Sequence, residues 1–347
     1  MKKTESKYII IGAGISGLTT AYQLLKEGEH NFLILEGRDR IGGRVLTKND
    51  IDFGPAWFQP SHKNLLQLLN DLDIEKFNQY SIGKNVLVYN TMAPAHYFES
   101  DQSQPSAYRV AGGSIQLIKK MASLLKDKIV LNTKVSKITE IENEIEVLTD
   151  NGLFSAEKAI ITLPPKLAIT LKYTPELPFE LNNVMKNTHT WMSNAIKVGM
   201  NYESPFWRKK GFSGTIIGQV GPVVELYDHT NADETTYSLM GFVNEGLRDV
   251  AAQERKERIL VYLEKYLGKQ VRHYLSYDEK DWSKDPYTSC SNLKSVYMSP
   301  KYGNPVFDML YMNGKLLFSG TETSPYFGGY IEGAVISGIL TANKIKA

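Results

Sequence analysis

The hexapeptide Gly12-Ala13-Gly14-Ile15-Ser16-Gly17 decides how this sequence folds. A short β-branched run, residues 7–11, precedes it, and apolar residues follow at helical spacing until Gly28 ends the pattern. A second apolar run then ends at Glu36. Strand, glycine turn, helix and strand within about 30 residues predict a βαβ unit, which implies a parallel sheet covered by helices on both faces.

Each glycine of this G-x-G-x-x-G pattern has a steric role. Gly12 allows the tight turn, Gly14 lets a pyrophosphate approach the backbone, and Gly17 lets helix and strand pack closely. Glu36 stands 19 residues after Gly17, where a carboxylate accepts hydrogen bonds from the adenosine ribose. An acid at this position disfavours a 2′-phosphate, so we predict a dinucleotide site that does not take NADP.

The residues after Glu36 favour FAD over NAD. The segment Glu36-Gly37-Arg38-Asp39-Arg40-Ile41-Gly42-Gly43-Arg44 adds a second glycine pair and several guanidinium groups directly after the ribose-binding carboxylate. These groups offer further hydrogen-bond donors to a pyrophosphate. A nicotinamide-binding domain needs no such segment.

Composition narrows the class of protein further. The 347 residues amount to about two domains. Forty Lys and Arg residues balance 38 Asp and Glu residues, for a net charge of +2, so we expect no nucleic-acid partner. The single cysteine, Cys290, allows no intramolecular disulfide and fits a reducing cytoplasm. No stretch approaches the roughly 18 apolar residues of a membrane span, so we expect a soluble protein.

The order of elements predicts an α/β fold with a second domain. Short strands dominate residues 195–243, one helix follows at 250–267, and a buried strand at 315–319 and a helix at 331–345 close the chain. We expect a discontinuous, Rossmann-like FAD-binding domain and a second α+β substrate domain. The FAD-binding domain would comprise residues 1–77, 107–165 and 282–347, and the substrate domain residues 78–106 and 166–281.

With these motifs in place, the sequence resembles the flavin-containing amine oxidases, and among them most a short, soluble, bacterial homologue of the monoamine oxidases. Three stretches are specific: the glycine-arginine segment, Ser204-Pro205-Phe206-Trp207-Arg208-Lys209-Lys210 after a strand lysine, and residues 319–323 together with 329–335. Matching stretches follow the family's order through nearly the whole chain, at residues 10–17, 35–44, 52–57, 112–114, 159–165, 196–210, 282–287 and 318–335.

The resemblance implies a two-domain flavoprotein with the flavin ring at the domain interface. The amides at the start of the last helix would face the pyrimidine oxygen of the flavin, where a helix N-terminus stabilises the negative charge of the reduced ring. The residues implied to bind FAD are Gly12, Gly14, Ser16, Gly17, Glu36, Arg38, Gly43, Arg44, Pro55, Ala56, Trp57, Val135, Trp282, Gly320, Thr321, Gly329 and Ile331.

Lys197 and Tyr330 are the catalytic candidates. Pattern alone favours an outward-facing Lys197 on an edge strand, but the resemblance implies that it approaches the reactive ring nitrogen of the flavin through a water molecule. Burial would lower its pKa, which suits a role in flavin reoxidation. Tyr330 matches one wall of the aromatic pair that flanks the substrate amine.

The sequence departs from the family in the substrate pocket. Ser291 stands where the closest relatives carry the cysteine that binds flavin covalently, so we expect non-covalent FAD. Asn292 replaces the second aromatic wall. A pocket of Tyr330 and Asn292 therefore lacks one ring unless a neighbour such as Tyr287 or Tyr326 supplies it.

The second domain is also short. Only residues 78–106 separate the first flavin segments from Gly112, where relatives insert a large, mostly helical portion. A smaller lid should leave the flavin more open, which admits bulky substrates or requires a partner surface to close the site. We also expect no membrane-anchoring tail.

The reaction implied is transfer of a hydride equivalent from an amine to FAD, followed by reoxidation by dioxygen to give hydrogen peroxide. Two alternatives stay open: an amino-acid oxidase, with Arg109 or Arg208 binding the substrate carboxylate, and a flavoprotein with little turnover that acts in binding or assembly. The six histidines show no metal-binding spacing, so we expect no metal site. A homodimer is also left open.

Overall fold

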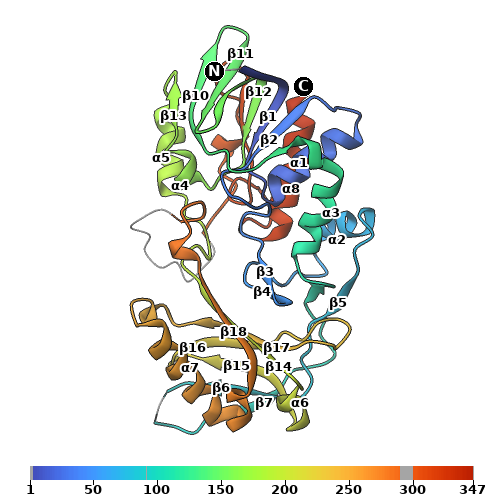
Figure 1. Ribbon diagram of the computed structural model, residues 1–347, viewed down its shortest axis with the longest axis vertical. Helices are drawn as coiled ribbons and strands as arrows, with labels where there is room; N and C mark the ends of the chain where they lie inside the picture. Colours follow the sequence, from blue (N-terminus) through green and yellow to red (C-terminus); the bar gives the residue numbers. More distant parts are fainter. Residues whose placement is uncertain (1–2, 91, 290–299, 347) are drawn as a thin grey trace.

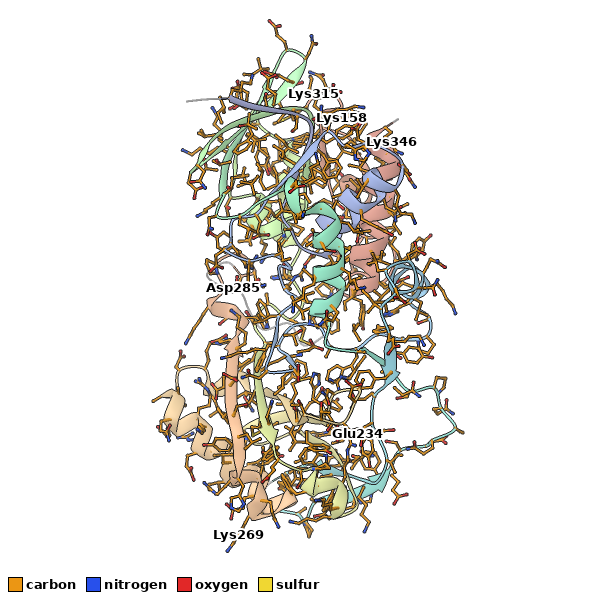
Figure 2. All side chains as sticks on the ribbon, turned by 45° about the vertical axis from the view of Figure 1, so that its right-hand side comes forward. Lys158, Glu234, Lys269, Asp285, Lys315 and Lys346 are labelled. Carbon is orange, nitrogen blue, oxygen red and sulfur yellow. The ribbon has the colours of Figure 1, made fainter. Side chains whose placement is uncertain are left out.

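The computed structural model describes residues 3–90, 92–289 and 300–346. Two β-sheets lie at opposite ends of an elongated molecule, and both chain termini lie in the first body (Figure 1). Figure 2 places Lys158 and Lys346 in this first body, Lys269 at the far end of the second, and Asp285 at the level where the two bodies meet.

The first sheet is built around β1 (Lys3–Ile11). β1 pairs in parallel with β2 (Phe32–Leu35) and β12 (Gly152–Ile161). Ile9, Ile10 and Ile11 are fully buried, as expected for a parallel strand covered on both faces. The strand order is β13-β10-β11-β12-β1-β2-β9, with β19 beside β12. The bounds of the other strands are β9 Ile129–Val130, β10 Val135–Ile141, β11 Glu144–Thr149, β13 Lys172–Thr174 and β19 Leu316–Phe318.

Helices from both ends of the chain cover one face of this sheet. α1 (Ile15–Lys26) packs against α8 (Ile331–Ile345), so closely that a Cβ on Gly338 would lie 2.7 Å from the Ser16 carbonyl oxygen. α2 (Lys63–Asp71) and α3 (Ile115–Leu125) share the same apolar core. The predicted α/β class and the return of the C-terminal strand and helix to the first domain are thereby confirmed.

The boundary between the two bodies differs from the one expected. Residues 166–187 were assigned to the second domain, yet β13 pairs in parallel with β10, and α4 (Pro165–Ala168) and α5 (Phe179–Asn187) lie against the first sheet. The physical reason is packing, because Leu181 and Met185 of α5 are fully buried in the core beneath this sheet.

The second sheet is almost entirely antiparallel. Its order is β18-β14-β17-β16-β15-β6-β7, and α7 (Ala252–Leu267) buries Ile259 and Leu263 in the core that it shares with this sheet. The bounds are β6 Lys84–Val88, β7 His96–Glu99, β14 Ile196–Tyr202, β15 Phe212–Gly218, β16 Val223–Asp228, β17 Tyr237–Val243 and β18 Tyr274–Asp281, with α6 at Phe206–Lys209.

Two short ribbons lie between the bodies. β5 (Lys76–Asn78) pairs with β8 (Tyr108–Val110), and β3 (Thr47–Lys48) pairs with β4 (Ile51–Asp52). The β3–β4 hairpin reaches the second sheet, where Gly199 of β14 leaves room for it: a Cβ on Gly199 would lie 2.8 Å from Ile51. The turn that follows β4 is therefore held by both bodies.

The buried carboxylate of Glu332, in the first turn of α8, holds α2 in place. It accepts hydrogen bonds from the backbone N–H groups of Asn64 (3.0 Å) and Leu65 (2.7 Å), at a helix start that no side chain of its own caps. We expect Glu332→Ala to lower the free energy of unfolding by about 2–4 kcal/mol, because it leaves the buried Leu65 N–H unpaired and removes the acceptor of the Asn64 N–H. Urea unfolding of the apoprotein checks this, and Glu332→Gln should fall in between.

None of the helices in the described part of the chain is long and apolar enough to cross a membrane.

Candidate active site

The three glycines of the first turn have different surroundings. A Cβ on Gly17 would lie 2.1 Å from the Gly12 carbonyl oxygen, and one on Gly12, where φ is +113°, would lie 2.5 Å from Thr162 Oγ1. A Cβ on Gly14 would meet no protein atom within 4 Å. Gly14 is also the N-cap of α1 and offers no side-chain acceptor, so the amides of the first turn remain available to a pyrophosphate.

Glu36 and Arg38 form the ribose end of the site. Glu36 is buried, and its carboxylate accepts hydrogen bonds from the backbone N–H groups of Ala13 (2.8 Å) and Arg38 (2.9 Å). The Arg38 guanidinium donates to Asp285 Oδ1 (2.8 Å) and lies 5.0 Å from the centre of the Tyr287 ring. Tyr287 therefore lies at the ribose end. Nothing in the sequence linked Arg38 to Asp285.

The segment that carries Val135 runs beside these residues. The backbone N–H of Thr133 donates to the Glu36 carbonyl (2.8 Å), and that of Asn132 donates to the Arg38 carbonyl (2.8 Å). Val135 itself is buried at the start of β10. The segment that carries Val135 thus lies beside Glu36 and Arg38, and the contact of Val135 with the adenine stays a prediction.

The second glycine pair packs onto the first. A Cβ on Gly43 would lie 3.3 Å from Gly14 Cα. Arg40, which sequence reasoning did not single out, closes this turn by donating to the carbonyls of Gly43 (2.8 Å) and Val45 (3.2 Å). Arg44 pairs with the buried carboxylate of Glu322, with Nη1 2.8 Å from Oε1.

Hydroxyl groups join the N-terminal turn to the C-terminal segment. Ser16 Oγ lies 2.7 Å from Ser319 Oγ, and Ser337 Oγ accepts from the Gly320 backbone N–H (2.9 Å). The Thr321 hydroxyl donates to the Tyr330 carbonyl (2.8 Å). The structure thus brings together predicted cofactor residues that lie more than 300 positions apart. Gly329 takes a left-handed φ of +87°, Tyr330 is the N-cap of α8, and Ile331 begins a helix whose first amides no side chain caps.

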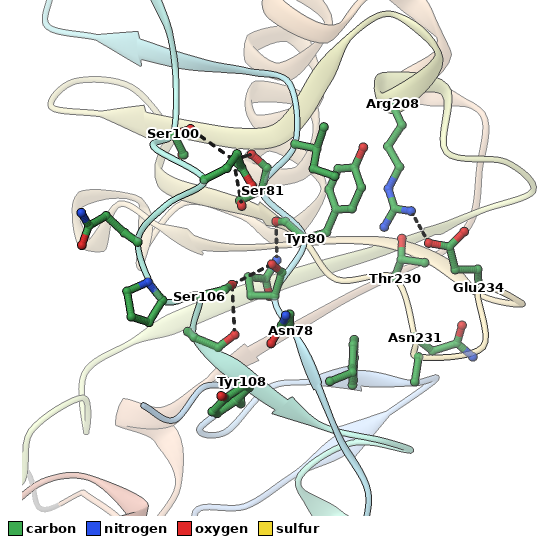
Figure 3. Close-up of a pocket in the computed structure, with 18 of the residues that line it drawn as sticks. Asn78, Tyr80, Ser81, Ser100, Ser106, Tyr108, Arg208, Thr230, Asn231 and Glu234 are labelled. Atoms are coloured by element: carbon green, nitrogen blue, oxygen red, sulfur yellow. Dashed lines mark hydrogen bonds and ion pairs between the residues drawn. The ribbon is translucent and has the colours of Figure 1, made fainter. Parts of the chain in front are cut away.

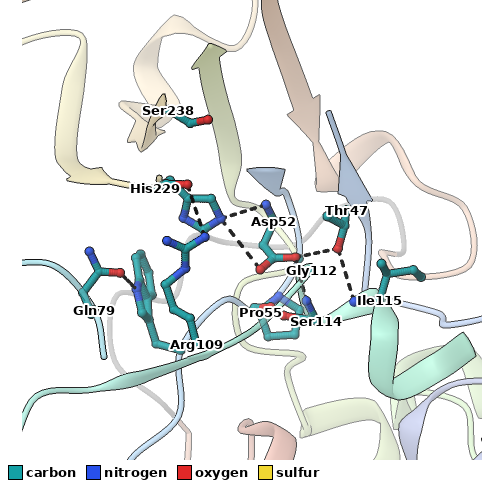
Figure 4. A network of polar contacts seen from close by, with 12 residues as sticks. Thr47, Asp52, Pro55, Gln79, Arg109, Gly112, Ser114, Ile115, His229 and Ser238 are labelled. Atoms are coloured by element: carbon teal, nitrogen blue, oxygen red, sulfur yellow. Dashed lines mark hydrogen bonds and ion pairs between the residues drawn. The ribbon is translucent and has the colours of Figure 1, made fainter. Parts of the chain in front are cut away.

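The turn that contains Pro55, Ala56 and Trp57 is held by five side chains from other parts of the chain. Trp282 donates to the Phe53 carbonyl (2.7 Å) and Gln79 accepts from the Trp57 indole (2.7 Å). The remaining three are Lys197, His229 and Ser114, of which Figure 4 shows His229 and Ser114 together with Gln79. Protein side chains alone therefore hold this turn.

Lys197 is buried on an interior strand, which excludes the outward-facing lysine on an edge strand that the strand pattern alone favours. β14 lies between β18 and β17, and Lys197 is 4% exposed. Its ammonium donates to the backbone carbonyls of Gly54 (2.6 Å) and Asp52 (3.1 Å) and lies 5.6 Å from the centre of the Trp57 ring. Burial lowers the pKa of Lys197 to about 8.

Aromatic rings gather around Tyr330. Its ring centre lies 5.1 Å from that of Trp191, at an interplanar angle of 64°, and 5.7 Å from that of His62. Trp191 was not among the predicted site residues, although its position six residues before Lys197 could have indicated it. Tyr326 is 67% exposed. Cys290, Ser291 and Asn292 lie outside the described residues.

The hydrogen-bonding groups of this site fit FAD. An open approach to Gly14, a ribose-side carboxylate and two uncapped helix starts match a dinucleotide with a flavin ring. Among the residues that the structure describes, no cluster of His, Cys, Asp or Glu is arranged to hold a metal ion.

Solved structures share this fold. Putrescine oxidase bound to putrescine matches with a TM-score of 0.86 at 24% identity, covering 99% of this chain and 100% of that one. Cyclohexylamine oxidase from Brevibacterium oxydans IH-35A matches with a TM-score of 0.84 at 22% identity, covering 98% of each chain. At these identities the likeness concerns the fold.

Curated relatives align along almost the whole chain. Amine oxidase [flavin-containing] A of Sus scrofa is 27% identical over 451 positions, covering 97% of this chain and 84% of the relative. A probable flavin-containing monoamine oxidase A of Dictyostelium discoideum is 24% identical, covering 97% of each. The first alignment spans over a hundred more positions than the 347 residues of this chain.

The family model described as "Flavin containing amine oxidoreductase" matches in two segments, residues 15–93 and 83–346. They meet at β6 and the loop after it, where the helical insert was expected to be missing. Together they take in residues 15–346, which is most of the chain and includes every described part of the flavin site after Gly14. This protein therefore belongs to the flavin-containing amine oxidoreductases, and it is an FAD-dependent amine oxidase.

Proposed function

We propose that this enzyme oxidises a primary amine of the monoamine type to the imine at the ring cluster of Tyr330 and Trp191, with dioxygen as the electron acceptor. One observation favours an amine oxidase over an amino-acid oxidase, and it concerns the two arginines that are candidates for binding a substrate carboxylate. Arg109 is buried and donates to the backbone carbonyls of His229 and Thr230, and Arg208 is paired with Asp228 (2.7 Å). Neither is free to bind a carboxylate.

The chain's own residues supply binding, orientation and exclusion of water, whereas bound FAD supplies the acceptor for two electrons. The α1 amides hold the pyrophosphate, Glu36 holds the ribose, and the first amides of α8 stabilise negative charge on the ring. The aromatic side chains desolvate the amine and favour its neutral form, which carries the lone pair needed for oxidation. No general base is required for this chemistry.

Trp191 provides the second aromatic wall in this proposal. We expect Trp191→Ala to slow anaerobic reduction of the flavin by an aromatic amine about tenfold, because it removes one aromatic contact to the substrate. Trp191→Phe should retain most of the rate because a ring remains beside Tyr330. Stopped-flow absorbance measures both variants. Equal rates for Trp191→Ala and the wild type would remove this residue from the substrate site.

A cavity lies near the flavin turn. This cavity has a volume of about 720 Å³, is lined by residues 77–82, 104–108 and 230–232 among others, and is shown in Figure 3. One of its lining residues, Gln79, holds the Trp57 indole. We infer that amines with bulky substituents enter from this side.

The test of the function is anaerobic mixing of the purified holoprotein with tyramine, putrescine and L-phenylalanine. Bleaching of the flavin by tyramine, followed by peroxide release when air is admitted, supports the proposal. Bleaching by L-phenylalanine alone would favour an amino-acid oxidase. No bleaching by any amine would leave a flavoprotein of little turnover.

The flavin should be held without a covalent bond. Ser291 offers no thiol at the expected attachment position, and covalent attachment through sulfur requires a thiolate. We expect acid precipitation to leave the yellow flavin in the supernatant. Flavin that stays with the pellet would contradict this and point to Cys290.

We further propose that the protein works in a reducing cytoplasm, as its single cysteine suggests, and that this is the cytoplasm of a bacterium, as the family resemblance implies. The homodimer stays a prediction, and light scattering of the holoprotein tests it.

A further inference from the structure

A buried polar group that the reaction above does not use lies behind the flavin turn. Asp52, Arg109 and His229 form it, each at most 2% exposed, and they come from β4, β8 and the residue after β16 (Figure 4). Burying three ionisable side chains together is costly unless their contacts are specific. Their contacts lead to Lys197.

His229 holds one side of Asp52. Its Nε2 accepts a hydrogen bond from the Asp52 backbone N–H (3.0 Å). An acceptor nitrogen carries no proton, so the ring is neutral with its proton on Nδ1. Burial supports this state because it lowers the pKa of His229 to about 4.

Arg109 holds the backbone that carries this ring. Its guanidinium donates to the carbonyls of Thr230 (2.8 Å) and His229 (3.3 Å). Burial lowers the pKa of Arg109 to about 10, which leaves it charged at neutral pH. A planar fork can hold two neighbouring carbonyls at once, whereas an ammonium cannot do so with the same geometry.

The other side of Asp52 holds Lys197. The Asp52 carbonyl and the Gly54 carbonyl accept from the Lys197 ammonium at 3.1 and 2.6 Å. Asp52 therefore connects the two side chains: its backbone N–H bonds to His229, and its backbone carbonyl bonds to Lys197. We propose that His229 and Arg109 are positioning residues for Lys197, which fix the peptide groups of Asp52 so that its carbonyl holds the ammonium beside the flavin.

This inference rests on the proposed function, in which dioxygen reoxidises the flavin, and on the role in reoxidation that the family resemblance implies for Lys197. Reoxidation moves two electrons and one proton from the reduced flavin to dioxygen and takes one further proton from solvent, giving hydrogen peroxide. A positive charge close to dioxygen stabilises the negative charge that it gains when electrons arrive. We therefore expect the position and charge of Lys197 to affect the rate of reoxidation.

The charge of Lys197 depends on few neighbours. Asp52 and Glu225 favour the charged form and Arg109 disfavours it, while His229 is neutral. Lys280, its register partner on β18, lies 3.3 Å from Asp285 and is paired there. Losing the Asp52 carbonyl would remove one of two acceptors, so the pKa of Lys197 should fall.

The experiment compares His229→Leu, which removes the acceptor, with His229→Gln, whose side-chain oxygen keeps one. The flavin is reduced by light and EDTA without any amine, and its reoxidation by dioxygen is followed from pH 6 to 10, together with a pH titration of the oxidised flavin spectrum. For the wild type we expect a midpoint near pH 8 in both. His229→Leu should move both midpoints down by about one pH unit, with reoxidation about fivefold slower at pH 8.

His229→Gln should behave like the wild type, and Arg109→Lys, which keeps the charge and loses the fork, should follow His229→Leu. Tyr262→Phe is the matched control, because it changes a buried hydroxyl elsewhere in the second body and should leave both midpoints in place.

Unchanged midpoints in flavin-loaded His229→Leu and Arg109→Lys would overturn the inference, and Arg109→Lys carries the test if His229→Leu does not fold. Because no amine is used, a protein that oxidises no amine but shows the expected shifts would refute the proposed function and leave this inference standing.

Discussion

Gly14→Ala should weaken FAD binding by about a hundredfold or more and leave the apoprotein folded with nearly unchanged stability. The backbone at Gly14 has φ −80°, which alanine adopts without strain, and its Cβ would meet no protein atom within 4 Å. The methyl group would instead occupy the space through which a pyrophosphate must approach. Loss of the N-cap preference costs the apoprotein about 1 kcal/mol at most.

Gly17→Ala is the matched comparison, since it lies in the same motif. Its Cβ would lie 2.1 Å from the Gly12 carbonyl oxygen, so strand and helix must separate, and we expect a loss of about 3 kcal/mol in the apoprotein itself. Flavin-binding titrations and urea unfolding of both variants separate the two effects. If Gly14→Ala bound FAD as the wild type does, the pyrophosphate would lie elsewhere.

The parts of the fold that the sequence could predict are those with a local signal. The glycine turn lies between β1 and α1 as expected, because Gly12, Gly14 and Gly17 are required by contacts within a few residues. β13 could not be predicted to join the first sheet, since three residues carry no periodicity that tells which sheet will accept them.

The site was harder to predict for the same reason. The two acceptors of Lys197 are backbone carbonyls, and every residue has one, so no residue type in the sequence marks them. The contact between Trp191 and Tyr330 joins two aromatic residues far apart in the chain, and composition alone cannot pair them. The family resemblance pointed correctly to a buried Lys197, where the strand pattern pointed outward.

Lys197→Met should change how the stability of the apoprotein depends on pH. The pKa of Lys197 is about 8 in the folded protein and about 10.5 when unfolded, so between these values the unfolded chain holds a proton that the folded chain has released. Wild-type stability should therefore rise with pH in this window, by about 2–3 kcal/mol between pH 7 and pH 10. Below pH 8 both states carry the proton, and the cost of burying the charge is fully present.

Methionine removes this cost and also removes the two hydrogen bonds to Asp52 and Gly54, worth about 1.5–3 kcal/mol each to a charged donor. At pH 7 the two effects should partly cancel. The stability of Lys197→Met should therefore lie closer to that of the wild type at pH 7 than at pH 10, where the variant should be less stable by about a further 2–3 kcal/mol. Val198→Ala, a fully buried and non-titrating change on the same strand, should lower stability equally at every pH. Urea unfolding at pH 7, 8, 9 and 10 measures these differences. If the free energy of unfolding of Lys197→Met changed with pH in parallel with that of the wild type, Lys197 would keep an ordinary pKa and carry its full charge beside the flavin throughout this range.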